Sequence, residues 1–109
     1  MLGEFEYLVL CAVARLGDRA YGAAVRRELE GVVGRTCSIG ALYTTVDRLE
    51  EKGLLETWMG EATPERGGRQ KRMIRVTRQG TAEAGDFYGA VARASHGLKW
   101  ARAKAGEPS

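Results

Sequence analysis

One segment of the chain is delimited at both ends by residues typical of helix termini, and it constrains the fold more than any other. Ser38 can accept a free backbone N–H of a first helical turn, and Gly53 suits the left-handed conformation that ends many helices. Between them, an apolar residue recurs every three or four positions, at Ile39, Leu42, Val46 and Leu49. This spacing predicts an α-helix with that stripe facing a core.

Two stretches with the same spacing precede this helix. The first runs from Phe5 to Leu16 and ends before a glycine, and the second runs from Tyr21 to Val33 and stops near Gly34. The turn before Ser38 is short, and a short turn holds two helices at a steep angle. The order therefore predicts a helix-turn-helix within a group of three helices.

The pattern changes after Gly53. Leu54 to Met59 lacks helical periodicity and includes threonine and tryptophan, which favour strands. Thr63 to Arg69 contains a proline and two glycines and predicts a turn. Arg72 to Val76 predicts a second strand with Ile74 and Val76 on one face. Together these segments predict a β-hairpin with a long tip, which is a wing.

A final helix is expected after Thr77, which can cap it. Its apolar positions are spaced by four, three, four and three residues, close to a coiled-coil repeat, at Phe87, Val91, Ala94, Leu98 and Ala101. Three glycines (residues 80, 85 and 89) lower the intrinsic helix propensity here, so the helix needs a packing partner.

These elements predict an α+β, mostly α fold: a winged helix-turn-helix of three helices and a two-stranded wing, followed by a long C-terminal helix. We expect the winged helix-turn-helix at residues 1–78, the C-terminal helix, whose seam close to a coiled-coil repeat suits dimerisation, at 79–105 and a frayed tail at 106–109. The chain has 109 residues, a size typical of one domain.

Positive charge is concentrated in the predicted wing and the strand after it. Between Gly60 and Arg78 there are six basic and two acidic residues, a local net charge of +4, whereas the whole chain carries only +3. A local basic loop of this kind suits the phosphates of a DNA backbone.

The composition argues against several other classes of function. With one histidine and two widely separated cysteines, the sequence contains no nucleophile–histidine–acid set, metal-ligand spacing or cofactor motif, so we expect no enzyme, metal site or cofactor. No apolar run approaches the roughly 20 residues that cross a bilayer. The acidic first six residues lack the basic start of a signal peptide, and we expect a cytoplasmic protein.

Three segments resemble the PadR family of transcriptional regulators: Ser38 to Leu55 with its Gly-x-Leu-Tyr and Leu-Glu-x-x-Gly-Leu motifs, Thr63 to Arg72 in the wing, and Tyr21-Gly22. The resemblance covers roughly residues 3 to 100 and matches the short members with one C-terminal helix. It implies a homodimer in which that helix packs on the partner's N-terminal helix. It also implies repression at a roughly palindromic duplex-DNA operator and, in some members, relief by a phenolic or other aromatic small molecule.

The candidate DNA contacts lie on the outer side of the third helix and in the wing. Small residues let the helix approach a groove, Thr44 offers a methyl or hydroxyl group, and arginines reach guanine, phosphate or the minor groove. The predicted set is Ser38, Gly40, Ala41, Tyr43, Thr44, Arg48, Arg66, Arg69, Lys71 and Arg72. Tyr43 either packs in the core or reaches a phosphate. The acidic residues Glu50 and Glu51 are expected to face away from DNA or to pair locally with Lys52 and Arg48.

The candidate dimer interface combines apolar residues of the first and last helices: Phe5, Leu8, Phe87, Val91, Ala94 and Leu98. On another face of the last helix, Trp100 is either an interface anchor or the wall of an aromatic effector pocket, with His96 beside it. A winged helix that binds another protein instead of DNA remains an alternative function.

Overall fold

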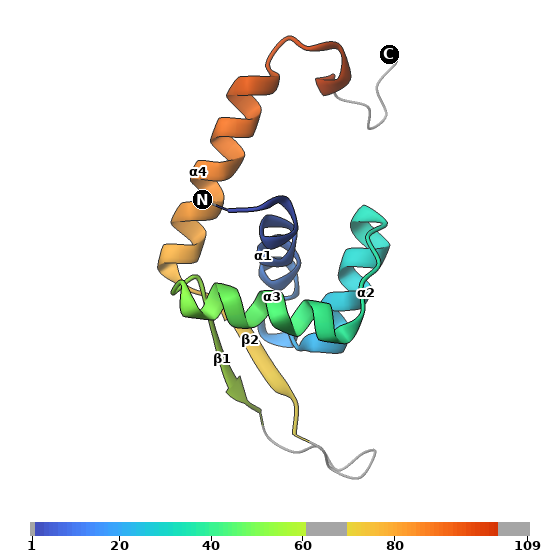
Figure 1. Ribbon diagram of the computed structural model, residues 1–109, viewed down its shortest axis with the longest axis vertical. Helices are drawn as coiled ribbons and strands as arrows, with labels where there is room; N and C mark the ends of the chain where they lie inside the picture. Colours follow the sequence, from blue (N-terminus) through green and yellow to red (C-terminus); the bar gives the residue numbers. More distant parts are fainter. Residues whose placement is uncertain (1, 61–69, 103–109) are drawn as a thin grey trace.

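The computed structural model describes residues 2–60 and 70–102 of the chain. In chain order the elements are α1 (Glu4–Leu16), the 3-10 turn η1 (Gly17–Arg19), α2 (Gly22–Val33), α3 (Ile39–Glu51), β1 (Leu55–Met59), β2 (Arg72–Val76), α4 (Arg78–Ser95) and the 3-10 turn η3 (Lys99–Ala101). The first three helices form a body from which the β-hairpin and α4 extend in opposite directions (Figure 1). The order of helices and strands predicted from the sequence is confirmed.

A single core lies between the three helices and the base of the hairpin. α3 contributes Leu42, Val46 and Leu49, each with no exposed surface, and they meet side chains of both other helices and Ile74 of β2. The predicted apolar stripe of α3 is therefore confirmed at these three positions. It is wrong at Ile39, which is 39% exposed, because helical side chains tilt toward the N-terminus and this first residue points past the end of the helix.

Helix termini follow the capping chemistry of the sequence. The Ser38 hydroxyl accepts the backbone N–H of Ala41 at 3.0 Å, which satisfies one of the free donors of the first turn. Gly34 and Gly53 adopt φ values of 68° and 80°, in the left-handed region that favours glycine. α2 and α3 are thereby held in the short-turn arrangement that the sequence predicts.

The hairpin pairs β1 with β2 in an antiparallel register that places Leu55 opposite Val76 and Met59 opposite Arg72. The turn after α1 adds a short third pairing, because the Ile74 N–H donates to the Ala20 carbonyl at 3.0 Å and Tyr21 forms a bridge with Met73. Sequence patterns did not predict this pairing. It anchors the base of the wing to the start of α2.

α4 begins as predicted and ends earlier than predicted. The Thr77 hydroxyl accepts the Gly80 N–H at 3.0 Å, and the helix ends at Ser95. Gly97 then adopts a φ of 79° and turns the chain. The predicted helix over residues 79–105 is therefore wrong beyond Ser95, and Leu98 does not continue the helical seam.

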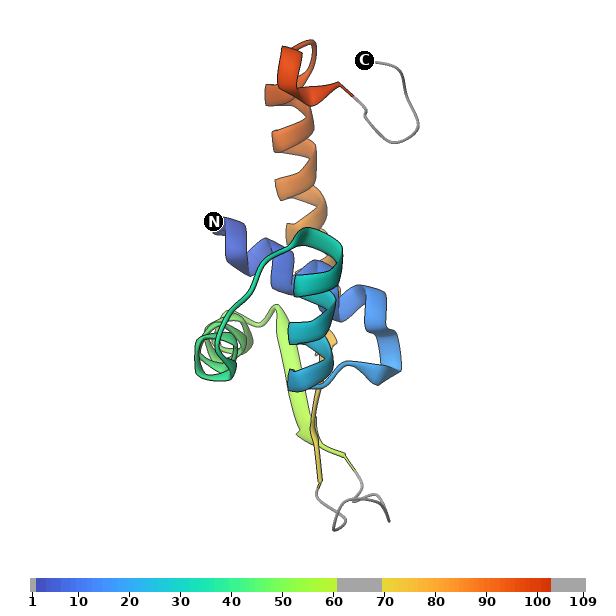
Figure 2. The same ribbon diagram turned by 90° about the vertical axis from the view of Figure 1, so that its right-hand side faces the viewer.

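α4 projects from the body over most of its length (Figure 2). Gly80 is its only buried residue among those described. Near the body, the ring of Phe87 stacks on Tyr7 of α1 with 4.7 Å between ring centroids. A largely exposed helix with three internal glycines has little intrinsic stability, so its outer part requires a partner.

A partly buried ion pair ties the start of α1 to the end of α3. The Glu6 side chain is 9% exposed and accepts two hydrogen bonds from Lys52 Nζ, at 3.0 and 3.2 Å. It also accepts the N–H of Gly3 at 2.9 Å. Burial would raise the pKa of Glu6, but these donors outweigh it and hold the pKa below its usual value of 4.5. The expectation that Lys52 pairs with its neighbours on α3 is wrong.

This pair makes folding sensitive to acid. A depressed pKa in the folded state contributes stability above the unfolded pKa, and that stability is lost as the pH falls through the folded pKa. We expect Glu6→Gln to lower the free energy of unfolding by about 1–2 kcal/mol at pH 7 and to lose this deficit as the pH falls through the lowered pKa of Glu6. Urea unfolding across pH measures both effects. Glu4→Gln is the control, since Glu4 forms an exposed pair with Arg35 and should change stability by less than about 0.5 kcal/mol. Equal curves for Glu6→Gln and the parent protein would contradict the prediction.

Candidate nucleic-acid interface

The outer face of α3 presents small and basic side chains to solvent. Gly40, Ala41, Thr44 and Arg48 are all exposed, as predicted from the helical spacing. The small residues lie in the first turn, where free N–H groups and the helix dipole favour a phosphate. Arg48 makes no hydrogen bond or ion pair with a described residue, so its guanidinium is available to a ligand.

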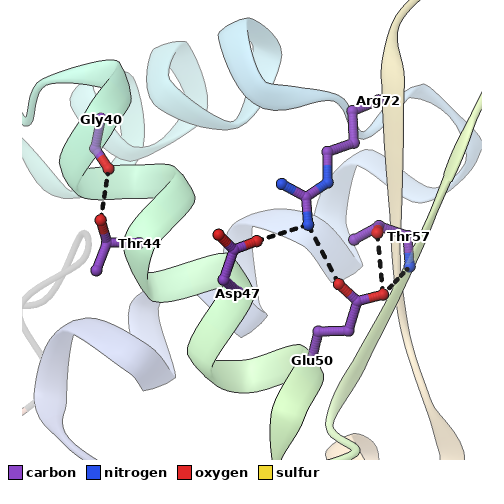
Figure 3. A network of polar contacts seen from close by, with 6 residues as sticks. All are labelled: Gly40, Thr44, Asp47, Glu50, Thr57 and Arg72. Atoms are coloured by element: carbon purple, nitrogen blue, oxygen red, sulfur yellow. Dashed lines mark hydrogen bonds and ion pairs between the residues drawn. The ribbon is translucent and has the colours of Figure 1, made fainter.

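Thr44 is positioned by its own helix. Its hydroxyl donates to the Gly40 carbonyl at 3.0 Å (Figure 3). With the hydroxyl proton used in this way, Thr44 cannot donate to a phosphate, whereas its methyl group can still contact a thymine methyl. Of the two roles predicted for Thr44, the geometry favours the apolar one.

Tyr43 is half-buried and packs against the start of α2. A Cβ added to Gly22 would lie 2.2 Å from the Tyr43 hydroxyl oxygen, so this position must be glycine for the ring to fit. Of the two roles predicted for Tyr43, this arrangement favours packing between α2 and α3.

Arg72 is the first residue of β2, and two acidic side chains of α3 hold its guanidinium. Its Nη2 donates to Asp47 at 2.7 Å and to Glu50 at 3.2 Å, and its guanidinium lies 5.4 Å from the centre of the Tyr43 ring (Figure 3). Burial lowers the pKa of Arg72, but Asp47 and then Glu50 outweigh it and raise the pKa above its usual value. The predicted role of Arg72 as a DNA contact is therefore not supported by its position.

The acidic residues of α3 also differ from expectation. Glu50 accepts from the hydroxyl and backbone N–H of Thr57 on β1, at 3.0 and 3.3 Å, as well as from Arg72. Glu50 thus joins both strands of the wing to the recognition helix, and local pairing with Lys52 or Arg48 is not observed. The reason is tertiary: the hairpin brings cationic and hydroxyl partners to this side of α3.

Two basic residues gather around Tyr21, near the end of the wing strands that carries Gly60 and Lys71. The ammonium group of Lys71, an exposed residue, lies 4.1 Å from the centre of the Tyr21 ring. Arg27 donates to the Tyr21 hydroxyl at 3.2 Å, and this bond is the main reason that the pKa of Tyr21 is lowered. Lys71 was predicted from the sequence, whereas Tyr21 and Arg27 were not. The pairing of Tyr21 with Met73, which no local pattern encodes, brings them together. The predicted contacts Arg66 and Arg69 lie outside the described residues.

The predicted dimer residues divide between the core and an exposed groove. Phe5 and Leu8 are half-buried against the core, and Phe87 stacks on Tyr7. Beyond the stack, α4 and the N-terminal segment form an open groove of about 490 Å³, lined by Leu2, Glu83, Asp86, Phe87, Ala90, Val91 and Ala94. Val91 within it is 46% exposed. This is a largely apolar surface beside a helix that requires a partner.

The candidate effector residues lie beyond the end of α4. His96 lines an open hollow of about 320 Å³ together with Tyr88. Trp100 lies in η3 and is 79% exposed. The prediction that Trp100 shares a helical face with His96 is wrong, because the helix ends before both residues.

Among the described residues, no group of three or more histidine, cysteine, aspartate or glutamate side chains could hold a metal ion. The described helices include none that is long and apolar enough to cross a membrane.

Comparison with known proteins finds solved structures with a similar architecture. The chain is similar to H. salinarum RosR (26% identity over 88% of this chain and 79% of that one, TM-score 0.67). It is also similar to a PadR-like transcription factor of Bacteroides fragilis (17% identity, 90% and 89%, TM-score 0.67). A third similar structure is Bacillus subtilis PadR in complex with operator DNA (18% identity, 78% and 46%, TM-score 0.64). Among curated proteins, none matches the sequence.

The likeness to these structures confirms the winged helix-turn-helix fold. A family model described as the transcriptional regulator PadR-like family matches residues 9–86, from the middle of α1 to the middle of α4. Members of this family regulate transcription and are not enzymes. The chain therefore belongs to the PadR-like family of transcriptional regulators.

Proposed function

We propose that this regulator binds a roughly palindromic duplex-DNA operator as a homodimer and represses transcription by occupying it. The observation that carries the proposal is the exposed face of α3. It combines a helix N-terminus, the Thr44 methyl group and Arg48, which pairs with no described residue, and a basic wing follows α3 in the sequence. This combination suits a helix that enters a major groove while phosphates bind around it.

The proposed dimer places two such helices side by side. The groove along α4 would be covered by the corresponding surface of a second copy, since a two-fold axis pairs identical patches. Two recognition helices then meet successive major grooves about 34 Å apart. Lys71 and the Tyr21 cluster would contact the flanking backbone, and the bound dimer would block access of the polymerase.

Fluorescence anisotropy on a duplex from upstream of its own gene, and on a scrambled duplex, tests DNA binding. We expect tighter binding to the upstream duplex, and affinity that falls with salt by a log–log slope of about −0.9 per phosphate contacted. Arg48→Ala should weaken binding to the upstream duplex by tenfold or more, because the change occurs in both half-sites.

Lys99→Ala is the matched control, because it removes the same charge from an exposed residue in η3, far from α3 along the chain. It should leave affinity nearly unchanged. Salt-independent or absent binding to both duplexes would contradict the proposal and would favour the alternative, a winged helix that docks on another protein.

We further propose an aromatic effector site near the end of α4, where a hollow is lined by His96 and Tyr88 and the exposed indole of Trp100 follows in η3. An aromatic acid bound between two copies would change the separation of the recognition helices and shift the population away from the DNA-binding state. The same anisotropy assay with added 4-hydroxybenzoate tests this, with a loss of DNA affinity as the expected result. No response would support Trp100 as an interface anchor.

A further inference from the structure

Two acidic residues of α3, Asp47 and Glu50, hold the Arg72 guanidinium, and the Asp47 side chain is the more exposed of the two. Glu50 holds the guanidinium from the direction of β1, where it is itself fixed by Thr57. Asp47 holds the same nitrogen from the outer face of α3, and the Asp47 side chain is 60% exposed. Figure 3 shows Asp47 on α3 between Thr44 and Glu50, with its carboxylate directed toward the guanidinium of Arg72.

Arg72 keeps exposed surface and unused N–H donors, and the exposed carboxylate of Asp47 lies beside them. The Arg72 side chain retains 27% of its exposed surface, and a guanidinium has five N–H donors, of which the two on Nη2 donate to described residues. A phosphate that approached this part of α3 would meet the carboxylate of Asp47 before it met the guanidinium. Without Asp47, Arg72 could remain bound to Glu50 and donate to a phosphate at the same time.

We propose that Asp47 is a specificity-determining residue, which covers the outer side of Arg72 and so prevents an additional, sequence-independent phosphate contact. Phosphate contacts supply essentially all of the affinity for non-operator DNA. A carboxylate that prevents one such contact per protomer lowers binding to bulk DNA, where the protein can shift to place a phosphate beside Arg72. It raises selectivity because the register of an operator complex is fixed by base contacts and does not require a phosphate at this position. This inference rests on the proposed DNA-binding function and adds a residue that sets its selectivity.

The size of the effect follows from counterion release. Each phosphate contact releases counterions, and the binding constant gains a factor equal to the molar salt concentration raised to the power of about −0.9. At about 0.15 M salt this factor is about fivefold. Since a homodimer carries two copies of Asp47, we expect Asp47→Ala to raise affinity for a scrambled duplex by about 30-fold. The log–log salt slope should steepen by about 2.

Glu51→Ala separates this effect from simple electrostatics. Glu51 lies on the same helix, is exposed and pairs with no described residue, so the substitution removes the same charge without uncovering an arginine. The double variant Asp47→Ala with Arg72→Gln has the net charge of the parent protein, and it should return the scrambled-duplex affinity and slope to those of the parent. Circular dichroism and thermal unfolding of each variant confirm that it is folded.

Anisotropy with the scrambled duplex across salt decides the inference without knowledge of the operator. Tighter binding and a steeper slope for Asp47→Ala than for Glu51→Ala, reversed in the double variant, are the expected results. Equal shifts in the two single variants would overturn the role of Asp47 while leaving DNA binding intact. If the parent protein itself shows no salt-dependent binding to DNA, the proposed function fails and this inference fails with it.

Discussion

Substitution of Gly80 by alanine is expected to destabilise the fold by about 3 kcal/mol or more. A Cβ at this position would lie 2.2 Å from the backbone carbonyl oxygen of Leu54 and 2.9 Å from Val76 Cγ1. The oxygen cannot move aside, because it accepts the N–H of Thr77 at 3.1 Å. α4 would therefore have to separate from the end of α3 and the base of the wing. Urea unfolding followed by circular dichroism at a fixed protein concentration measures the loss.

Gly85→Ala is the matched control for this prediction. The substitution is the same and lies in the same helix, but a Cβ at Gly85 would meet nothing within 4 Å. Alanine is the better helix former, so this variant should be more stable by about 0.5–1 kcal/mol. Loss of stability in both variants would show that α4 tolerates no change in its glycines, and that the contact with Leu54 is not the cause.

Introduction of a charge at Val91 is expected to abolish dimerisation and, with it, tight operator binding. Val91 is a half-exposed residue of the groove along α4, between Phe87 and Ala94. In a dimer that covers this groove, Val91→Glu would bury a carboxylate beside Glu83 and Asp86, which already line it. A monomer loses the benefit of two linked half-sites, so operator affinity should fall by about 100-fold or more. Light scattering and anisotropy measure the two effects.

Ala82→Glu provides the comparison for Val91→Glu. Ala82 is an exposed residue of α4, nine positions before Val91, which places it on the opposite side of the helix at 100° per residue. The added charge is the same, and we expect a dimer that binds the operator with nearly parent affinity. A dimeric Val91→Glu variant would contradict the proposed interface.

Local patterns were sufficient for the elements and for most of their ends. The caps at Ser38 and Thr77 and the left-handed Gly53 depend only on neighbouring residues, and the structure confirms all three. The same holds for the exposed face of α3, because helical spacing decides which side faces away from an apolar stripe. The end of α4 was missed, since the apolar repeat continued past Ser95 although Gly97 turns the chain.

Charged partners could not be predicted in this way. The sequence placed Arg72 among the DNA contacts with the other basic residues near the wing, but in the structure it pairs with Asp47 and Glu50, 25 and 22 positions away. Likewise, Lys52 pairs with Glu6 across 46 positions. No periodicity relates such residues, and their proximity arises only when the core brings the hairpin and α1 against α3.

The sequence by itself therefore determined the winged helix-turn-helix architecture, the family and the exposed side of α3, because these follow from short-range spacing, capping and motifs. Only the tertiary structure decided which charges remain available to a ligand. An ion pair depends on a distance of a few ångströms between segments far apart in the chain. For this reason Arg48 remains a candidate contact with DNA, whereas Arg72 is held by Asp47 and Glu50 within the protein.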